Sequence, residues 1–232
     1  MCDYLQLTDK YTTMNFNFLF QFLSELKENN TKIWFDLNRD RYKIIKEELE
    51  SFTKEWIIEL GKIDPTIGNL DAKKCGFRIN RDVRFSNNKD PYKTNMGIFL
   101  NQGGKSAWNA GYYLHLEPNN CFFAAGNHQP EADQLIKIRQ EIDYNFDDFK
   151  NIITEKTFVE NFKTLNKENS LKKSPKAYTE DNPAIEYLKL KSFIVETKIS
   201  DENVKNPIFI NDLMKLSKSV KPLILFLNQA MV

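Results

Sequence analysis

The sequence predicts an α+β fold in which N-terminal helices precede a central antiparallel sheet and C-terminal helices follow it. Three observations favour this order. Apolar residues recur at helical spacing over residues 15–60, they alternate with polar residues between 75 and 125, and helical spacing returns after Pro130. Tight turns separate the alternating segments, which is typical of a meander.

The first predicted helix covers residues 15–29 and the second region covers 33–60. Asn15 or Asn17 can cap the first helix, because a short polar side chain there accepts a hydrogen bond from a free backbone N–H. Its apolar stripe consists of Phe18, Phe22 and Leu26. The second region is expected to be a short turn followed by a long amphipathic helix that ends at Gly61. Both stripes indicate core packing.

The central sheet is predicted from alternation with a period of two, which places every second side chain on one face. The strands expected here cover residues 75–85, 92–100, 111–117 and 121–125. A turn at 102–104 and another at 118–120 separate the later strands. These short, closely spaced strands predict an antiparallel meander.

The last third of the chain is predicted to be mainly helical. A helix follows Pro130, and residues 145–170 show no clear period. The remaining elements expected are a helix over 184–190, a strand over 192–199, and a C-terminal helical stretch that starts at Pro207 and is kinked or restarted at Pro222.

The composition limits the class of protein. Of 232 residues, 33 are basic and 32 acidic, 41% are apolar and 13% aromatic. This apolar content excludes intrinsic disorder, and a net charge of +1 excludes a strongly basic, histone-like protein. We expect residues 14–232 to form a single domain and residues 1–13 to be an N-terminal extension.

The cysteines and the hydropathy pattern predict a cytoplasmic protein with no membrane partner. Cys2, Cys75 and Cys121 are far apart and form no C-x-x-C pair, so we expect free thiols in a reducing compartment. The chain has no apolar run of the roughly 20 residues that a membrane helix needs. The first residues lack the apolar core of a signal peptide.

One segment departs from this ordinary pattern. Residues 72–113 hold eight basic and two acidic residues, a net charge of +6. The chain has 27 Lys and only six Arg, yet three of the six lie within seven residues. Arginine offers a planar, permanently charged fork for phosphate or carboxylate. The residues predicted to bind an anionic ligand are Arg78, Arg81, Arg84, Lys89, Tyr92 and Lys93.

The strand expected over 75–85 constrains this anion site. Arg78, Asp82 and Arg84 would share one face, so Asp82 can fix the fork of Arg84. Arg81 would lie on the apolar face, and it is then either buried and paired or turned outward by a bulge. A structural ion network is therefore an alternative explanation for the same arginines.

Four side chains are candidates for proton transfer. They are Asp82, Tyr92, His115 and Glu117. Tyr113, His115 and Glu117 share one face of their predicted strand, so a meander can bring them close to the arginines.

Other motifs do not indicate a cofactor or a metal. Residues 103–106 resemble the end of a P-loop, but Phe99 stands where its first glycine belongs, so we interpret them as a hairpin loop. His115-Leu116-Glu117 lacks the later P-C-x-x-C of a zinc deaminase, and the chain has only two histidines. We therefore predict no metal site, and the sequence names no cofactor.

The basic segment carries a family resemblance. Residues 78–92 contain the run R-x-x-R-D-x-R-F-x-x-x-K-x-x-Y. With GYYLHLEP at 111–118, LKKSPK at 171–176 and LKLKSF at 188–193, the chain resembles a widespread family of uncharacterised bacterial and fungal proteins, classed as a domain of unknown function. The similarity covers most of residues 15–230. It implies one domain with a shared site, and no established activity.

Three functions from different classes fit these observations. The first is a small-molecule site for a phosphorylated or carboxylated ligand, serving either binding or catalysis. The second is a structural or protein-interaction domain, in which Arg81 and Arg84 are buried and fully paired. The third, ranked last, is a nucleic-acid-binding module that uses the mixed basic and aromatic side chains of the +6 segment.

Overall fold

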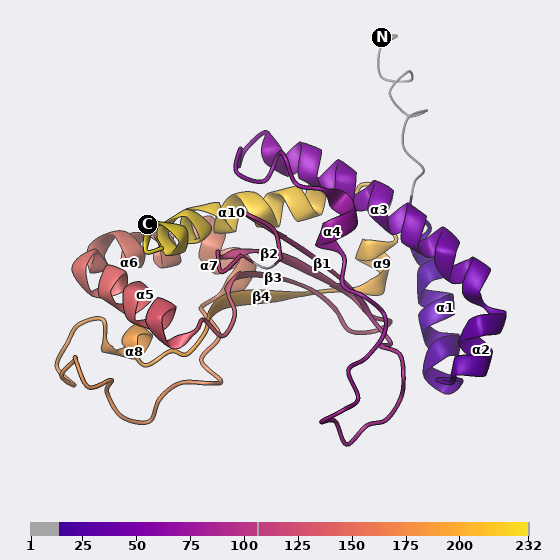
Figure 1. Ribbon diagram of the computed structural model, residues 1–232. Helices are drawn as coiled ribbons and strands as arrows, with labels where there is room; N and C mark the ends of the chain where they lie inside the picture. Colours follow the sequence, from indigo (N-terminus) through magenta and orange to yellow (C-terminus); the bar gives the residue numbers. More distant parts are fainter. Residues whose placement is uncertain (1–13, 106, 232) are drawn as a thin grey trace, which may run out of the picture.

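The computed structural model describes residues 14–105 and 107–231 (Figure 1). The N-terminal extension expected over 1–13 lies outside the described residues. The helices are α1 (Phe16–Glu28), α2 (Lys32–Leu37), α3 (Arg39–Gly61), α4 (Ala72–Cys75), α5 (Ala132–Tyr144), α6 (Phe146–Thr154), α7 (Lys156–Phe162), α8 (Ile185–Leu188), α9 (Asp201–Val204) and α10 (Phe209–Gln229). The strands are β1 (Met96–Asn101), β2 (Gly111–Leu116), β3 (Cys121–Asn127) and β4 (Phe193–Ile199).

The four strands form one antiparallel sheet in the order β1-β2-β3-β4. Strands β1 to β3 are a meander, as the sequence predicts, and β4 returns to pair with β3 after the helices that follow Pro130. Helices precede, interrupt and follow the sheet. The predicted α+β class is therefore confirmed.

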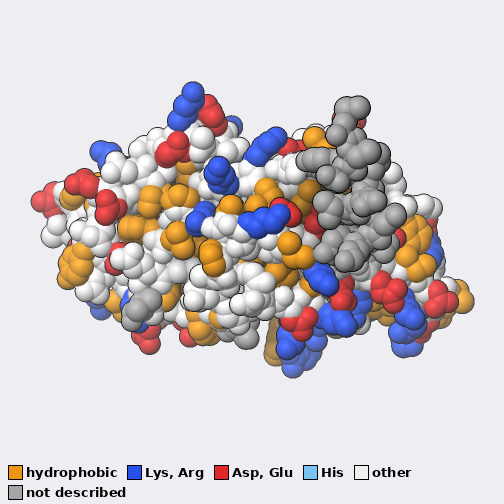
Figure 2. Space-filling model, turned by 90° about the horizontal axis from the view of Figure 1, so that it is seen from above, with side chains coloured by type: hydrophobic (Ala, Val, Ile, Leu, Met, Phe, Trp, Pro, Cys, Tyr) orange, Lys and Arg blue, Asp and Glu red, His pale blue; other side chains and the backbone are white. Residues whose placement is uncertain are grey.

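Helices cover one face of this sheet. Figure 1 shows α3 and α10 lying across it, and α10 packs against β3. The two faces of β2 therefore differ in burial. Tyr112, Leu114 and Leu116 face the helices and are fully buried, whereas Tyr113 and His115 lie on the opposite face and are partly exposed. Seen from the helix side, charges of both signs are interleaved on the surface (Figure 2).

The other face of the sheet is flanked by two long loops. Figure 1 shows residues 76–95 hanging beside one end of this face and residues 163–184 beside the other. The half-buried side chains of β2, Tyr113 and His115, therefore lie on the face that these loops flank, and this arrangement positions the site described below.

Local signals explain the elements that were predicted correctly. The Asn15 side chain accepts a hydrogen bond from the backbone N–H of Phe18, so Asn15 is the cap of α1. Thr31 caps α2 in the same way. The expected turn at 118–120 contains Asn119 with a φ of 63°, a conformation that asparagine tolerates better than most residues.

Three predictions about the elements were wrong or incomplete. Residues 75–85 do not form a strand; α4 ends at Cys75 and a loop follows. Residues 145–170, which show no clear period, contain α6 and α7. Helix α10 runs through Pro222 without a break, so this proline does not start a new helix.

Candidate functional site

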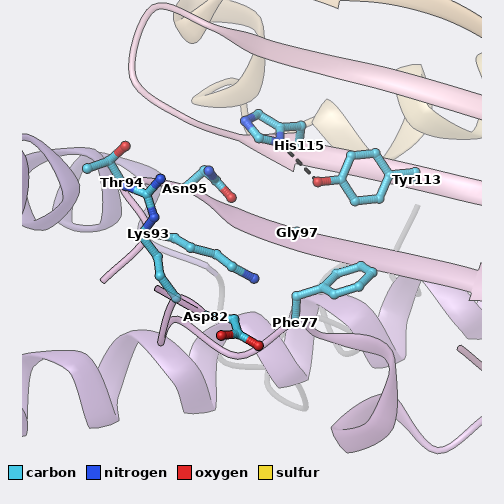
Figure 3. Close-up of a pocket in the computed structure, with 9 residues that line it drawn as sticks. Phe77, Asp82, Lys93, Thr94, Asn95, Gly97, Tyr113 and His115 are labelled. Atoms are coloured by element: carbon cyan, nitrogen blue, oxygen red, sulfur yellow. Dashed lines mark hydrogen bonds between the residues drawn. The ribbon is translucent and has the colours of Figure 1, made fainter. Parts of the chain in front are cut away.

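A cleft of about 600 Å³ opens on the face of the sheet opposite α3 and α10 (Figure 3). Strands β1 and β2 form its floor, and the loop 76–95 forms its rim. Residues that line it include Arg81, Asp82, Lys93, Gly97, Tyr113 and His115. The fold thus brings Arg81 and Lys93 of the predicted anion site together with two predicted proton-transfer residues, Asp82 from the loop and His115 from β2.

The rim of the cleft is a loop because residues 76–95 pair mainly with one another and not with the sheet. After an isolated bridge between Gly76 and Ile98, the segment leaves β1, and Asn80 pairs with Tyr92 farther along the loop. The strand predicted for this region required Phe85 to be half-buried, but its side chain is 95% exposed. The expected alternation of faces over 75–85 is therefore absent.

Positive charge gathers at the rim. The Lys93 side chain extends over the cleft toward the Phe77 ring, whose centre lies 5.7 Å from Nζ (Figure 3). Burial, followed by the charges of Arg78, Lys105 and Arg81, lowers the pKa of Lys93. Among the described residues, no carboxylate forms an ion pair with Lys93.

Arg81 is only loosely engaged by the protein. Its guanidinium lies 3.9 Å from the carboxylate of Asp90, and its side chain is 30% exposed. Because the predicted strand is absent, Arg81 is neither buried on an apolar face nor turned outward by a bulge. It lies on the wall of the cleft.

Two residues of the predicted anion site, Arg84 and Lys89, hold the loop and do not line the cleft, whereas Asp82 does both. Asp82 fixes the fork of Arg84 through bonds of 2.9 Å from Nε and 2.6 Å from Nη2, as the sequence predicts. The Arg84 side chain is 76% exposed. Lys89 donates to the carbonyl of Val83 across the loop.

Tyr92 lies in the packing between the loop and the N-terminal helices. Its ring stacks on Phe35 with 4.0 Å between the ring centres, and it is 6% exposed. The Asn30 side chain bonds both the backbone N–H and the carbonyl of Tyr92. The structure places this candidate outside the cleft, where it anchors the loop to α2.

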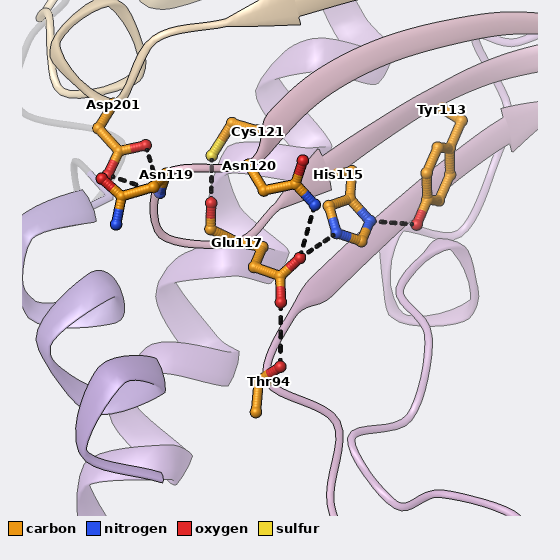
Figure 4. A network of polar contacts seen from close by, with 8 residues as sticks. All are labelled: Thr94, Tyr113, His115, Glu117, Asn119, Asn120, Cys121 and Asp201. Carbon is orange, nitrogen blue, oxygen red and sulfur yellow. Dashed lines mark hydrogen bonds and ion pairs between the residues drawn. The ribbon is translucent and has the colours of Figure 1, made fainter. Parts of the chain in front are cut away.

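A chain of polar contacts runs from the cleft along the open face of the sheet (Figure 4). The Tyr113 hydroxyl lies 3.0 Å from Nδ1 of His115, and Nε2 of His115 lies 3.4 Å from Glu117. Thr94 and Asn120 donate to the two carboxylate oxygens of Glu117. The expected grouping of Tyr113, His115 and Glu117 on one face is confirmed.

The protonation states of this chain follow from burial and hydrogen bonding. Burial raises the pKa of Glu117, but hydrogen bonds from Asn120, Thr94 and His115 outweigh it and leave the pKa lowered. Burial lowers the pKa of His115 despite the nearby carboxylate, and it raises the pKa of Tyr113 to about 12.

At neutral pH, Glu117 is therefore a carboxylate that can only accept, so Nε2 of the neutral His115 carries the proton. Nδ1 is then an acceptor, and the Tyr113 hydroxyl donates to it. The chain presents a phenol oxygen at the cleft with an imidazole behind it that can take a proton.

Gly97 leaves room for the Tyr113 ring. It pairs with His115 across β1 and β2, and a methyl group at Gly97 would lie 2.8 Å from the Tyr113 hydroxyl oxygen. Gly97 and Tyr113 are not among the residues predicted from the sequence to bind an anion or to transfer a proton. The signal for Tyr113 was its position two residues before His115 on one strand face.

The two cysteines in the described part of the chain do not line the cleft. Cys75 and Cys121 are buried free thiols, and burial raises both pKa values, that of Cys121 to about 11. Within residues 14–105 and 107–231, no group of three or more His, Cys, Asp or Glu side chains could hold a metal ion.

The hairpin loop that resembles a P-loop end connects β1 to β2, as predicted. Lys105 of this loop donates to the carbonyl of Gly76 and lies 5.1 Å from the centre of the Phe77 ring. It therefore adds a positive charge beside the cleft rather than holding a phosphate in a glycine-rich turn.

Comparison with known proteins identifies the family. No helix in the described part of the chain is long and apolar enough to span a membrane. No curated protein and no solved structure is significantly similar to this chain. A family model for conserved hypothetical proteins, DUF2461, matches residues 18–226, and this confirms the expected domain-of-unknown-function family. The chain therefore belongs to the DUF2461 family of conserved hypothetical proteins.

Proposed function

We propose that the cleft binds a small organic anion through a phosphate or carboxylate group. The observation that carries this proposal is the position of Lys93, which extends over the cleft beside Arg81 and forms no ion pair among the described residues. The charges of Arg78 and Lys105 act on the same ammonium group. A bound anion would relieve this repulsion between like charges.

The two alternatives fit the geometry less well. A structural ion network requires Arg81 and Arg84 to be buried, but their side chains are 30% and 76% exposed. A nucleic-acid-binding module favours a flat, continuous basic stripe. The cations here surround a concave cleft, and charges of both signs are interleaved on the helix side (Figure 2).

An enzymatic role is the second candidate, and the Tyr113–His115–Glu117 chain favours it. In such a reaction the Tyr113 oxygen takes a proton from the ligand held by Lys93 as its own hydroxyl proton passes to Nδ1 of His115, and Glu117 stabilises the resulting imidazolium. The two transfers are coupled, because burial raises the pKa of Tyr113 and disfavours a free phenolate. Turnover of an anionic substrate that is lost in Tyr113→Phe, while binding is retained, would support this role.

Calorimetric titration with inorganic phosphate at low salt tests the binding proposal. Wild type and Lys218→Met should bind phosphate equally, because Lys218 is an exposed lysine on α10, away from the cleft. Lys93→Met should bind at least about tenfold more weakly, the loss expected for one charge-assisted contact. Equal affinity of Lys93→Met and wild type, or no binding of phosphate and succinate by wild type, would reject the proposal.

A further inference from the structure

The cleft continues into a second hollow of about 540 Å³ on the same face of the sheet. Phe77 and Tyr113 line both hollows, so the two are adjacent parts of one groove. We call the first the acid compartment, lined by Arg81, Lys93 and His115. We call the second the ring compartment; Phe99, Trp108, Phe122, Ala124 and Ile194 are among its lining residues.

Small residues on β2 and β3 form the floor of the ring compartment, so few side-chain atoms extend into it. Gly111 pairs with Gly126 across β2 and β3, and Ala124 lies opposite Tyr113 in the same ladder. A methyl group at Gly111 would lie 2.9 Å from the Phe99 ring. Gly126 has a φ of 125°, which side-chain-bearing residues rarely adopt. The floor at this pair is therefore bare backbone.

The walls of this compartment are aromatic. Trp108 is 55% exposed, although it is a large apolar side chain, and it lines the hollow from the loop between β1 and β2. Phe99 and Phe122 line it from β1 and β3. A flat backbone floor with aromatic walls favours a planar ring over a branched or highly polar group.

From this arrangement we infer that the occupant of the groove is a planar aromatic acid, with its acidic group at Lys93 and Arg81 and its ring system in the ring compartment. The inference rests on the proposed anion site and names the ligand class for it. Nζ of Lys93 lies 5.7 Å from the centre of the Phe77 ring, and Phe77 lines both compartments. A bicyclic ring whose acidic group contacts Lys93 therefore extends into the ring compartment.

Charge along the groove supports a single acidic group. Arg81 and Lys93 line the acid compartment together with one carboxylate, Asp82. In the ring compartment Lys105 lies on the β1 side, whereas Glu196 lines the hollow from β4 at the opposite edge of the sheet. The exposed Glu196 carboxylate would repel a second acidic group at that end. It would accept a hydrogen bond from a ring N–H.

Calorimetry with acetate, 2-naphthoate and 2-naphthamide tests this inference on the full chain. Naphthoate should bind at least about tenfold more tightly than acetate, because its ring is removed from water. Naphthamide, which has the ring without the charge, should bind more weakly than naphthoate. Lys93→Met should weaken the binding of both acids, since it removes the charge that they share.

Two variants locate the ring. Ala124→Leu fills the floor and should abolish the advantage of naphthoate over acetate while leaving phosphate binding intact. Trp108→Ala should reduce the same advantage, and it removes a half-exposed loop side chain, so it is the safer variant for folding.

The outcomes separate the two proposals. If phosphate and acetate bind to wild type but naphthoate binds no better than acetate, the aromatic ligand class is wrong and the anion site stands. A naphthoate advantage that survives both Ala124→Leu and Trp108→Ala would place the ring elsewhere and overturn the inference. Failure of every acid to bind would overturn both proposals.

Discussion

Gly97→Ala should displace the Tyr113 ring and break its contact with His115. The added methyl group would lie 2.8 Å from the Tyr113 hydroxyl oxygen and 3.0 Å from Cε2 of the ring. Both separations are shorter than carbon and oxygen atoms tolerate without a shift. The methyl group would also lie 3.1 Å from Cδ2 of the Phe77 ring, so a second aromatic ring crowds it.

The expected cost follows from three contributions. Overpacking of this kind typically costs about 1–3 kcal/mol. Loss of the 3.0 Å Tyr113–His115 hydrogen bond adds about 1 kcal/mol. Replacing glycine in a strand returns about 0.5–1 kcal/mol. The free energy of unfolding should therefore fall by about 1–3 kcal/mol, which lowers Tm by roughly 3–10 °C in a chain of this size.

Urea denaturation measures the change, and a neighbouring glycine provides the matched control. Gly76 has an extended backbone (φ −73°), and a methyl group there would meet no atom within 4 Å. Gly76→Ala should therefore be neutral or stabilising. The chain has only two histidines, so the His115 ring signal can be followed by NMR after assignment with His128→Gln.

A Gly97→Ala variant that is as stable as wild type and leaves the pH titration of His115 unchanged would contradict the predicted displacement of Tyr113. A double-mutant cycle sharpens the test. In a Tyr113→Ala background the ring is absent, so the added methyl group at Gly97 should cost nothing. A cost that persists in that background would assign the strain to the backbone or to Phe77.

Three further predictions address pH, a buried pair and the loop anchor. Burial lowers the pKa of His115 below 6.5, so the unfolded chain binds the proton first as the pH falls. The contribution of His115 to the free energy of unfolding should therefore be complete above about pH 6.5 and should decrease as the pH drops toward the folded-state pKa. Urea denaturation at several pH values should show a smaller decrease for His115→Gln than for wild type. Tyr112→Phe removes the 2.9 Å bond to the buried Asp64 and should cost about 1–3 kcal/mol in the same assay, whereas a change near zero would show that Asp64 needs no donor from Tyr112. Tyr92→Phe keeps the ring stacked on Phe35 and should retain both Tm and phosphate binding, so a selective loss of binding would return Tyr92 to the site.

The meander and its flanking helices could be predicted because local patterns coincide with the final packing. Strand β2 alternates strictly between residues packed under the helices and residues on the open face, and the sequence shows the same alternation. The Asn15 cap and the turn at 118–120 are likewise determined by residues close in the sequence. Such signals need no knowledge of the tertiary fold.

The loop 76–95 could not be predicted in this way. Its alternation resembles that of a strand, but a strand also requires a neighbour along its whole length. Within this segment β1 forms a bridge only with Gly76, and the chain then turns back so that Asn80 pairs with Tyr92. The hydrogen bonds of this pair join Arg81 to Pro91 and Lys93 to Ile79. The partner of each segment is chosen by the tertiary fold, and Phe85 is left in solvent as a result.

The basic motif divides into residues that shape the loop and residues that the loop presents. Arg84 is bound by Asp82, and Lys89 donates to a backbone carbonyl. Replacing either side chain would therefore change the conformation of the loop. Lys93 forms no ion pair among the described residues, and its charge points into the groove. A loss of binding in Arg84→Ala would therefore have two explanations, a changed loop conformation or a lost contact with the ligand. Lys93→Met removes a charge that forms no ion pair in the described part of the protein and contacts only the Phe77 ring there, so its effect on affinity reports mainly on the ligand.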